Sequence, residues 1–158
     1  MSATMSALPE IGSPAPDFTL RDQWGSAVTL SDFRGVSPVA LVFFPLAFTG
    51  TCTGELCELR DNIGVFADAG VQLVGISVDS VATLRQFADQ EGFTFPLLSD
   101  FWPHGAVAQV YGAFVEDRGF ATRATVVVNN SGLVHAAFQT SPGEARDLAA
   151  YREAIARL

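Results

Sequence analysis

Cysteine and histidine are scarce in this chain, which has only two of each in 158 residues. Two cysteines are too few for the disulfide framework of a small secreted domain, so we expect a cytoplasmic protein with reduced thiols. A zinc site would need histidine as well, and neither His104 nor His135 makes a close-spaced metal motif with Cys52 or Cys57. The sequence therefore predicts neither a bound metal nor a cofactor.

Long apolar runs and basic clusters are also missing. No apolar run reaches the roughly 18 residues that span a bilayer, and residues 1–16 lack the basic and apolar regions of a signal peptide. The formal net charge is −8, which argues against a basic face for nucleic acid or anionic lipid. We therefore predict no nucleic-acid partner and no membrane association.

Apolar residues are abundant, at 49% of the chain, whereas charged residues make up only 16%. This balance is unlike that of a disordered chain, and the length suits one domain with its own core. No internal repeat is visible. Residues 1–11 are predicted to form a flexible N-terminal arm, and residues 12–158 a single domain.

Hydrophobic patterning and turn residues predict alternating strands and helices over most of the chain. Strands are expected at 17–20, 27–30, 39–44, 71–78, 95–98, 124–128 and 133–138, and helices at 52–69, 80–91, 106–111 and from 142 onward. The first two and the last two strands each form a hairpin, whereas the helix between the central strands implies parallel pairing. The fold class is therefore α/β, with a mixed central sheet flanked by helices on both faces.

Residues 45–52 lie where the most apolar strand turns into a helix. Cys52 falls in the first helical turn, where Thr49 or Thr51 can serve as the N-cap and where unpaired N–H groups and the macrodipole favour a negative charge. A thiol in such a place ionises more readily, and the thiolate is the nucleophile. The alternative is a buried structural cysteine, which is common in protein cores.

The spacing of Pro45, Thr49 and Cys52 resembles the Pro-x-x-x-Thr/Ser-x-x-Cys signature of the peroxiredoxins, and residues 43–50 and 93–107 resemble the AhpE-type members of that family. The similarity covers nearly the whole chain. It implies a thioredoxin-like fold with an added N-terminal β-hairpin, and a homodimer formed through the active-site side. The implied function is a thiol-dependent peroxidase that reduces hydrogen peroxide and organic hydroperoxides through a Cys52 sulfenic acid.

The resemblance also implies roles for the residues around Cys52. Thr49 accepts a hydrogen bond from the incoming peroxide, and Pro45 shapes the loop and shields the thiolate. Arg123, at the start of a predicted strand, donates to a peroxide oxygen and favours the thiolate, while Glu55 holds Arg123 in place. From the residues alone simpler roles stay open: Thr49 can be only a helix cap, and Pro45 only a strand stop. Arg123 can form a surface ion pair, and Glu55 can be an acid that is favourable at a helix N-terminus.

Cys57 departs from the AhpE type, which usually keeps one cysteine. The Cys-x-x-x-x-Cys spacing resembles the bacterioferritin-comigratory branch, in which the second cysteine resolves the first. Five residues along a helix separate Cα atoms by about 8–9 Å, beyond the reach of about 7 Å for a disulfide, so the first helical turns must unwind. The helical wheel predicts that Cys57 points toward solvent, away from an inner face formed by Leu56, Leu59, Ile63 and Phe66. A bystander thiol is the alternative.

The sequence does not specify the reductant, and thioredoxin, a mycoredoxin-like protein and a low-molecular-weight thiol all fit. Other functions stay open beside the two-cysteine peroxidase. One is a one-cysteine peroxidase recycled by an external thiol. A thiol–disulfide oxidoreductase usually carries Cys-x-x-Cys, which is absent here. A metal-binding or chaperone protein with the thioredoxin fold would need a nearby histidine or an exposed apolar groove, and the sequence indicates neither.

Overall fold

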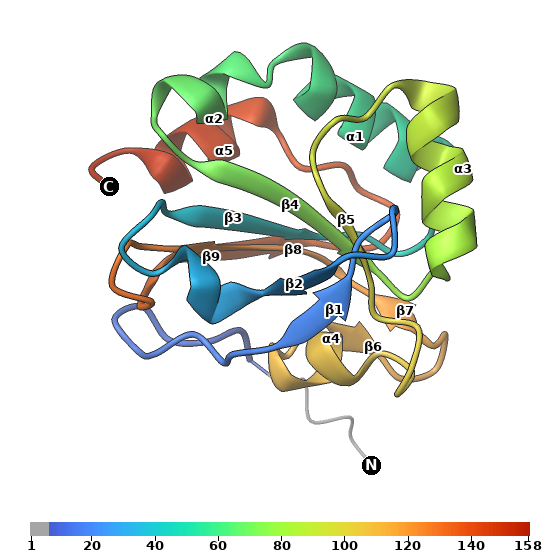
Figure 1. Cartoon of the computed structure of the whole chain (residues 1–158), viewed down its shortest axis with the longest axis horizontal. Coiled ribbons are helices and arrows are strands. Elements are labelled where there is room, and N and C mark those ends of the chain that lie inside the picture. Colours follow the sequence, from blue (N-terminus) through green and yellow to red (C-terminus); the bar gives the residue numbers. More distant parts are fainter. Residues whose placement is uncertain (1–6) are drawn as a thin grey trace.

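The computed structural model describes residues 7–158 and is built around a seven-stranded mixed sheet (Figure 1). The strand order is β2-β1-β5-β4-β3-β8-β9. The strands are β1 (Thr19–Arg21), β2 (Ala27–Thr29), β3 (Val39–Phe43), β4 (Gln72–Ser77), β5 (Leu97–Ser99), β8 (Arg123–Val128) and β9 (Val134–Thr140). β3 is buried along its whole length, as expected for a run of apolar residues covered on both faces.

The pairing directions follow the predicted order of elements. β3 pairs parallel with β4, and β4 pairs parallel with β5, so the chain must cross over between them. β8 pairs antiparallel with β3 and with β9. The two predicted hairpins, β1–β2 and β8–β9, are confirmed. The sequence does not predict the small hairpin of β6 (Phe114–Val115) and β7 (Phe120–Ala121), because two-residue strands show no periodicity.

Helices cover both faces of the sheet, as predicted (Figure 1). One face carries α1 (Gly50–Asp61), α2 (Gly64–Asp68), α3 (Val81–Glu91) and α5 (Leu148–Ile155), and the other carries α4 (Ala106–Val110) and the short helix η1 (Leu30–Phe33). The side chains of β3 alternate between the two cores: Val42 lies with α1 and α3, whereas Leu41 and Phe43 lie with α4. The predicted α/β class with a mixed sheet is therefore confirmed.

The helix predicted at 52–69 is wrong in its extent, because two helices, α1 and α2, take its place. The break is at Asn62, whose φ of −120° and ψ of 27° leave the helical region. Asparagine competes for backbone hydrogen bonds, and Gly64, two residues later, has a low helix propensity. Ile63, which lies in this break, is 38% exposed instead of on the inner face.

The last helix also begins later than predicted. Residues 142–147 are irregular, and α5 starts only after Asp147, whose carboxylate accepts a hydrogen bond from the N–H of Ala149 at 3.1 Å. Pro142 is compatible with a first helical turn, but the side-chain cap that fixes the start of the helix lies five residues later. The irregular segment has another use, since it brings a carbonyl and an arginine to the site described below.

The chain is tied to the sheet from Gly12 onward. The N–H groups of Gly12 and Ala15 donate to the carbonyls of Val134 and Gly132, at 2.7 and 2.9 Å. The predicted flexible arm, residues 1–11, lies partly outside the described residues and stays a prediction. Within residues 7–158, no helix combines the length and apolar character needed to cross a bilayer.

Candidate active site

Cys52 lies where the structure joins its central strand to its first helix. β3 ends at Phe43, a loop follows, and Cys52 is the third residue of α1, with its side chain fully buried. Leu56 and Leu59 are also fully buried and fix this face of α1 against the sheet. The predicted position in the first helical turn is confirmed, and the thiol therefore lies among the unpaired N–H groups of a helix N-terminus.

Contacts with Asp79 and with α3 hold the loop that precedes α1. Pro45 is buried, and the N–H of Ala47 donates to Oδ2 of Asp79 at 2.8 Å. Phe48 has a positive φ of 66°, and its ring centroid lies 5.0 Å from the ring centroid of Phe87 on α3. A left-handed conformation is costly for a residue with a Cβ, so these contacts must hold the loop in this shape.

Thr49 occupies the N-cap position of α1, but its side chain does not cap the helix. Its Oγ1 donates instead to the carbonyl of Leu46 at 2.9 Å, and the side chain is exposed. A hydroxyl that has used its proton in this way can still accept a hydrogen bond. Thr51, the other predicted cap, is already the second residue of the helix.

Arg123, the first residue of β8, contacts Cys52 from the strand next to β3. Its Nη2 donates to the Cys52 Sγ at 3.0 Å, and its Nε donates to the carbonyl of Pro142 at 2.6 Å. The antiparallel register that pairs Val42 with Thr125 puts the start of β8 beside the end of β3. The sheet therefore brings together two residues that are 71 positions apart in the chain.

Glu55 is the acceptor that holds Arg123. It lies one helical turn after Cys52, its side chain is buried, and its Oε1 accepts a hydrogen bond from the Arg123 Nη1 at 3.0 Å. The structure thus brings Cys52, Glu55 and Arg123 into contact, and the roles that the resemblance implies for them stay predictions. The guanidinium of Arg123 bridges a carboxylate and a thiol in a water-poor interior.

A second arginine, Arg146, completes the cluster, and the sequence does not predict it. Its Nη2 donates to Oε1 of Glu55 at 2.6 Å and its Nε donates to Oε2 at 2.9 Å. The carbonyl of Ala124 and the hydroxyl of Thr125 also accept from its Nη1, at 2.7 and 3.1 Å. Its guanidinium carbon lies 5.9 Å from the ring centroid of Tyr151. The only sequence signal is indirect: a buried carboxylate needs more donors than one arginine supplies.

The ionisation of Glu55 is controlled by these contacts. Burial by itself raises the pKa of the carboxyl group, since it withdraws the charge from water. The hydrogen bonds and positive charge of Arg146 act in the opposite direction, and the charge of Arg123 adds to them. Together they hold the pKa of Glu55 below its usual value, so Glu55 is a carboxylate at neutral pH.

The charges of the cluster do not balance without Cys52. Two guanidinium groups share one carboxylate, which leaves an excess positive charge in contact with Sγ. A buried charge is costly unless it is paired. A thiolate at Cys52 would supply the missing partner, and an adjacent arginine is one of the features that make a cysteine reactive.

Cys57 is not where the helical wheel predicts. It is half-buried, and its Sγ donates to Oε1 of Glu91 at 3.4 Å. The wheel predicts the wrong environment because it considers one helix alone, whereas the C-terminal end of α3 covers this side of α1. Burial raises the pKa of the Cys57 thiol, and the hydrogen bond to Glu91 raises it further, against the opposing charge of Arg60.

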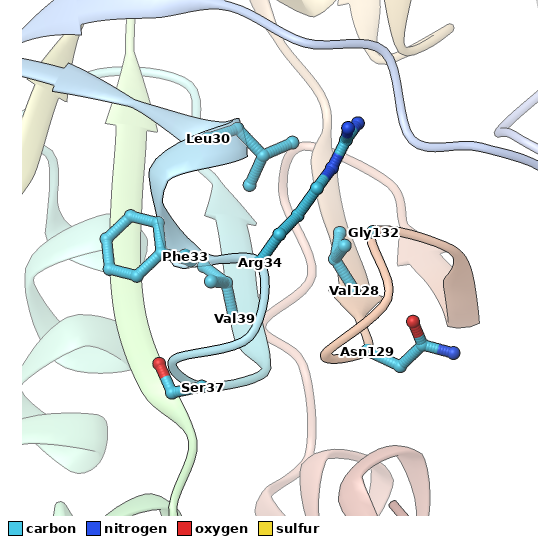
Figure 2. Close-up of a pocket in the computed structure, with 8 residues that line it drawn as sticks. All are labelled: Leu30, Phe33, Arg34, Ser37, Val39, Val128, Asn129 and Gly132. Carbon is cyan, nitrogen blue, oxygen red and sulfur yellow. The ribbon is translucent and has the colours of Figure 1, made fainter.

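One pocket in the described part of the chain lies away from Cys52. Its volume is about 10 Å³, and Arg34, Val39 and Val128 are among the lining residues that Figure 2 draws. Val39 and Val128 lie at the ends of β3 and β8 that are remote from Cys52. Among residues 7–158, no group of three or more His, Cys, Asp or Glu side chains is placed to hold a metal ion.

Known proteins match this chain in sequence and in structure. Residues 11–137 match the AhpC/TSA family. The chain is 53% identical over 148 residues to alkyl hydroperoxide reductase E of Mycobacterium tuberculosis, covering 94% of this chain and 97% of that protein. The crystal structure of peroxidoxin BcpB from the same species superposes with a TM-score of 0.81 at 35% identity, over 93% of this chain and 94% of its own. Reduced 2-Cys peroxiredoxin from Plasmodium vivax gives 0.83 at 27% identity, over 93% and 81%.

A buried cysteine at the start of a helix, on a thioredoxin-like sheet, is the architecture of a peroxiredoxin. The chain belongs to the AhpC/TSA family. The long match to alkyl hydroperoxide reductase E supports the AhpE type that the sequence predicts.

We expect Glu55→Gln to lower the free energy of unfolding at neutral pH by about 3–5 kcal/mol, because it leaves two buried guanidinium groups without a carboxylate. In the parent, the folded-state pKa of Glu55 lies below the unfolded value of about 4.3. The stability that it contributes is present above that value and is lost as the pH falls through the folded-state pKa. Urea unfolding at neutral and acidic pH measures both effects.

The matched control is Glu58→Gln, which removes an exposed carboxylate from the same helix. It should change the free energy of unfolding by no more than about 0.5 kcal/mol. If Glu55→Gln lost as much stability on acidification as the parent does, Glu55 would not be the ionised centre of the cluster.

Proposed function

We propose that this chain is a thiol-dependent peroxidase in which the Cys52 thiolate attacks the O–O bond of hydrogen peroxide or an organic hydroperoxide. The observation that carries the proposal is the contact of 3.0 Å between Nη2 of Arg123 and Sγ of Cys52, inside a cluster with excess positive charge. A nucleophile and a donor fixed side by side in a buried site are the two elements that such a displacement requires.

The reaction transfers one oxygen atom to sulfur. The Cys52 sulfur bonds to the hydroxyl oxygen of the peroxide, the O–O bond breaks, and the other oxygen leaves and takes up a proton as water or an alcohol. Arg123 donates to a peroxide oxygen and stabilises the developing negative charge. Thr49 accepts from the peroxide hydroxyl, and Pro45 keeps the loop closed over the thiolate. Cys52 is left as a sulfenic acid.

Cys57 then resolves the sulfenic acid. Its sulfur attacks the sulfur of Cys52, the S–S bond forms, the S–O bond breaks, and the hydroxide leaves as water with the Cys57 proton. The intact α1 keeps the two residues too far apart for a disulfide, whose Cα atoms must lie within about 7 Å. The first turns must therefore open, which breaks backbone hydrogen bonds worth about 0.5–1.5 kcal/mol each. Opening also exposes Leu56, at a cost of up to about 3 kcal/mol.

The alternative is a one-cysteine peroxidase, in which an external thiol reduces the Cys52 sulfenic acid and Cys57 takes no part. Thioredoxin, a mycoredoxin-like protein and a low-molecular-weight thiol remain the proposed reductants, in a cytoplasmic setting. A homodimer stays a prediction; exposed aromatic side chains are consistent with it, namely Phe48, Phe101 and Trp102. Sedimentation of the reduced protein tests it, and a purely monomeric protein at high concentration would remove it.

The reduced parent should consume one equivalent of hydrogen peroxide rapidly, and Cys52→Ser should consume none at that rate, because serine is a far weaker nucleophile at neutral pH. Stopped-flow measurement of peroxide consumption checks this. The matched control is Cys57→Ser, which keeps the Cys52 thiol and should still consume one equivalent. If Cys52→Ser reacted as fast as the parent, Cys52 would not be the peroxidatic residue.

Cys57→Ser should accumulate sulfinic acid on Cys52 at lower peroxide concentrations than the parent, because no internal thiol removes the sulfenic acid. The parent should instead lose two hydrogens to a Cys52–Cys57 disulfide, with faster amide exchange over residues 52–60 after oxidation. Mass spectrometry across a peroxide titration measures both. A parent that never forms the disulfide, with unchanged amide exchange, would identify the one-cysteine peroxidase.

A further inference from the structure

The resolving segment of α1 is tied to the last residue of α3 by two different bonds. The Cys57 Sγ donates to the side chain of Glu91, at 3.4 Å from Oε1. Nη1 of Arg60 donates to the backbone carbonyl of the same residue. Cys57 and Arg60 are three residues apart and therefore lie on one side of α1, where the two helices run over the same face of the sheet (Figure 1). Neither bond takes part in the Cys52 cluster.

We propose that Glu91 is a positioning residue that delays resolution, because its carboxylate holds the Cys57 thiol against α3 and must release it before Cys57 can reach Cys52. This inference rests on the proposed resolving role of Cys57. The thiol is the donor in this bond, so the bond keeps the proton on sulfur, and the protonated sulfur is the weak nucleophile. Opening of α1 breaks the bond and frees the thiol at the same time.

The electrostatic surroundings of Cys57 act in the same direction. Burial and the hydrogen bond to Glu91 raise the pKa of the thiol, and the negative charges of Glu91 and Asp61 add to that effect. Arg60 opposes them, but it also forms an ion pair with Asp61, with Nε at 2.9 Å from Oδ1. In the closed helix Cys57 is therefore a poor nucleophile as well as a distant one.

The consequence is a longer life for the Cys52 sulfenic acid. While Cys57 stays bound to Glu91, an external thiol can reach the sulfenic acid first, and excess peroxide can oxidise it to the sulfinic acid. The bond to Glu91 thus sets how the oxidised enzyme divides between internal resolution, external reduction and overoxidation. Release requires no further reactant, because disulfide formation balances as Cys–SOH plus Cys–SH giving a disulfide and water.

The test compares Glu91→Ala and Glu91→Gln with the parent in two measurements. The first is the rate at which iodoacetamide alkylates Cys57 in reduced protein that also carries Cys52→Ser. This rate does not depend on resolution, because Cys52 is absent. The second is the rate at which the disulfide forms after one equivalent of hydrogen peroxide. Glu91→Ala should raise both rates by about two- to tenfold, the factor that corresponds to loss of one hydrogen bond. Glu91→Gln should raise them less, because the amide oxygen can still accept from the thiol.

The matched control is Asp89→Asn, an exposed carboxylate two residues earlier on α3, which should leave both rates at the parent values. Unchanged alkylation in Glu91→Ala would overturn the hold on Cys57. Faster alkylation of Cys57 with an unchanged rate of disulfide formation would overturn the delay alone. A slower rate of disulfide formation would also overturn the delay, and would indicate that the Glu91 carboxylate acts as a base toward Cys57. If no disulfide formed in the parent either, the resolving role proposed for Cys57 would fail, and the delay with it.

Discussion

A single buried carboxylate orders the whole site. Glu55 accepts hydrogen bonds from both Arg123 and Arg146, and none of these three side chains is more than 2% exposed. Such a group is tolerated only when its hydrogen bonds are satisfied. Because each arginine also bonds to backbone carbonyls, Glu55 links α1 to β8 and to the segment before α5. The Cys52 sulfur accepts a hydrogen bond from Arg123, where this network has an excess positive charge.

The sheet supplies what the network needs. The antiparallel pairing of β3 and β8 brings Arg123 to the end of β3, and the chain turns there into α1. The loop between them is held independently, by the bond from Ala47 to Asp79 and by the packing of Phe48 on Phe87. The end of α1 that carries Cys52 is thus fixed on several sides. Its other side, at Cys57 and Arg60, forms its polar contacts with Glu91 at the C-terminus of α3.

Local features of this fold could be predicted from the sequence, and distant contacts could not. The central strand, the loop at Pro45 and the position of Cys52 in the first helical turn depend on neighbouring residues, and they are confirmed. Arg123 is recognisable only through the family resemblance. Arg146 meets Glu55 across 91 positions, from a segment without periodicity, so no pattern points to it. The helical wheel predicts the wrong environment for Cys57, because the periodicity of one helix does not reveal that α3 covers it.

We propose that the Arg123 guanidinium, held by Glu55, donates to the peroxide beside Cys52. The most direct measurement is the single-turnover rate of Cys52 oxidation in Arg123→Lys, which keeps the charge but lacks the planar fork. The account predicts a rate lower by about two orders of magnitude or more, as for loss of a preorganised donor. The control is Arg118→Lys, an exposed arginine, which should react like the parent. A parent-like rate in Arg123→Lys would contradict the account.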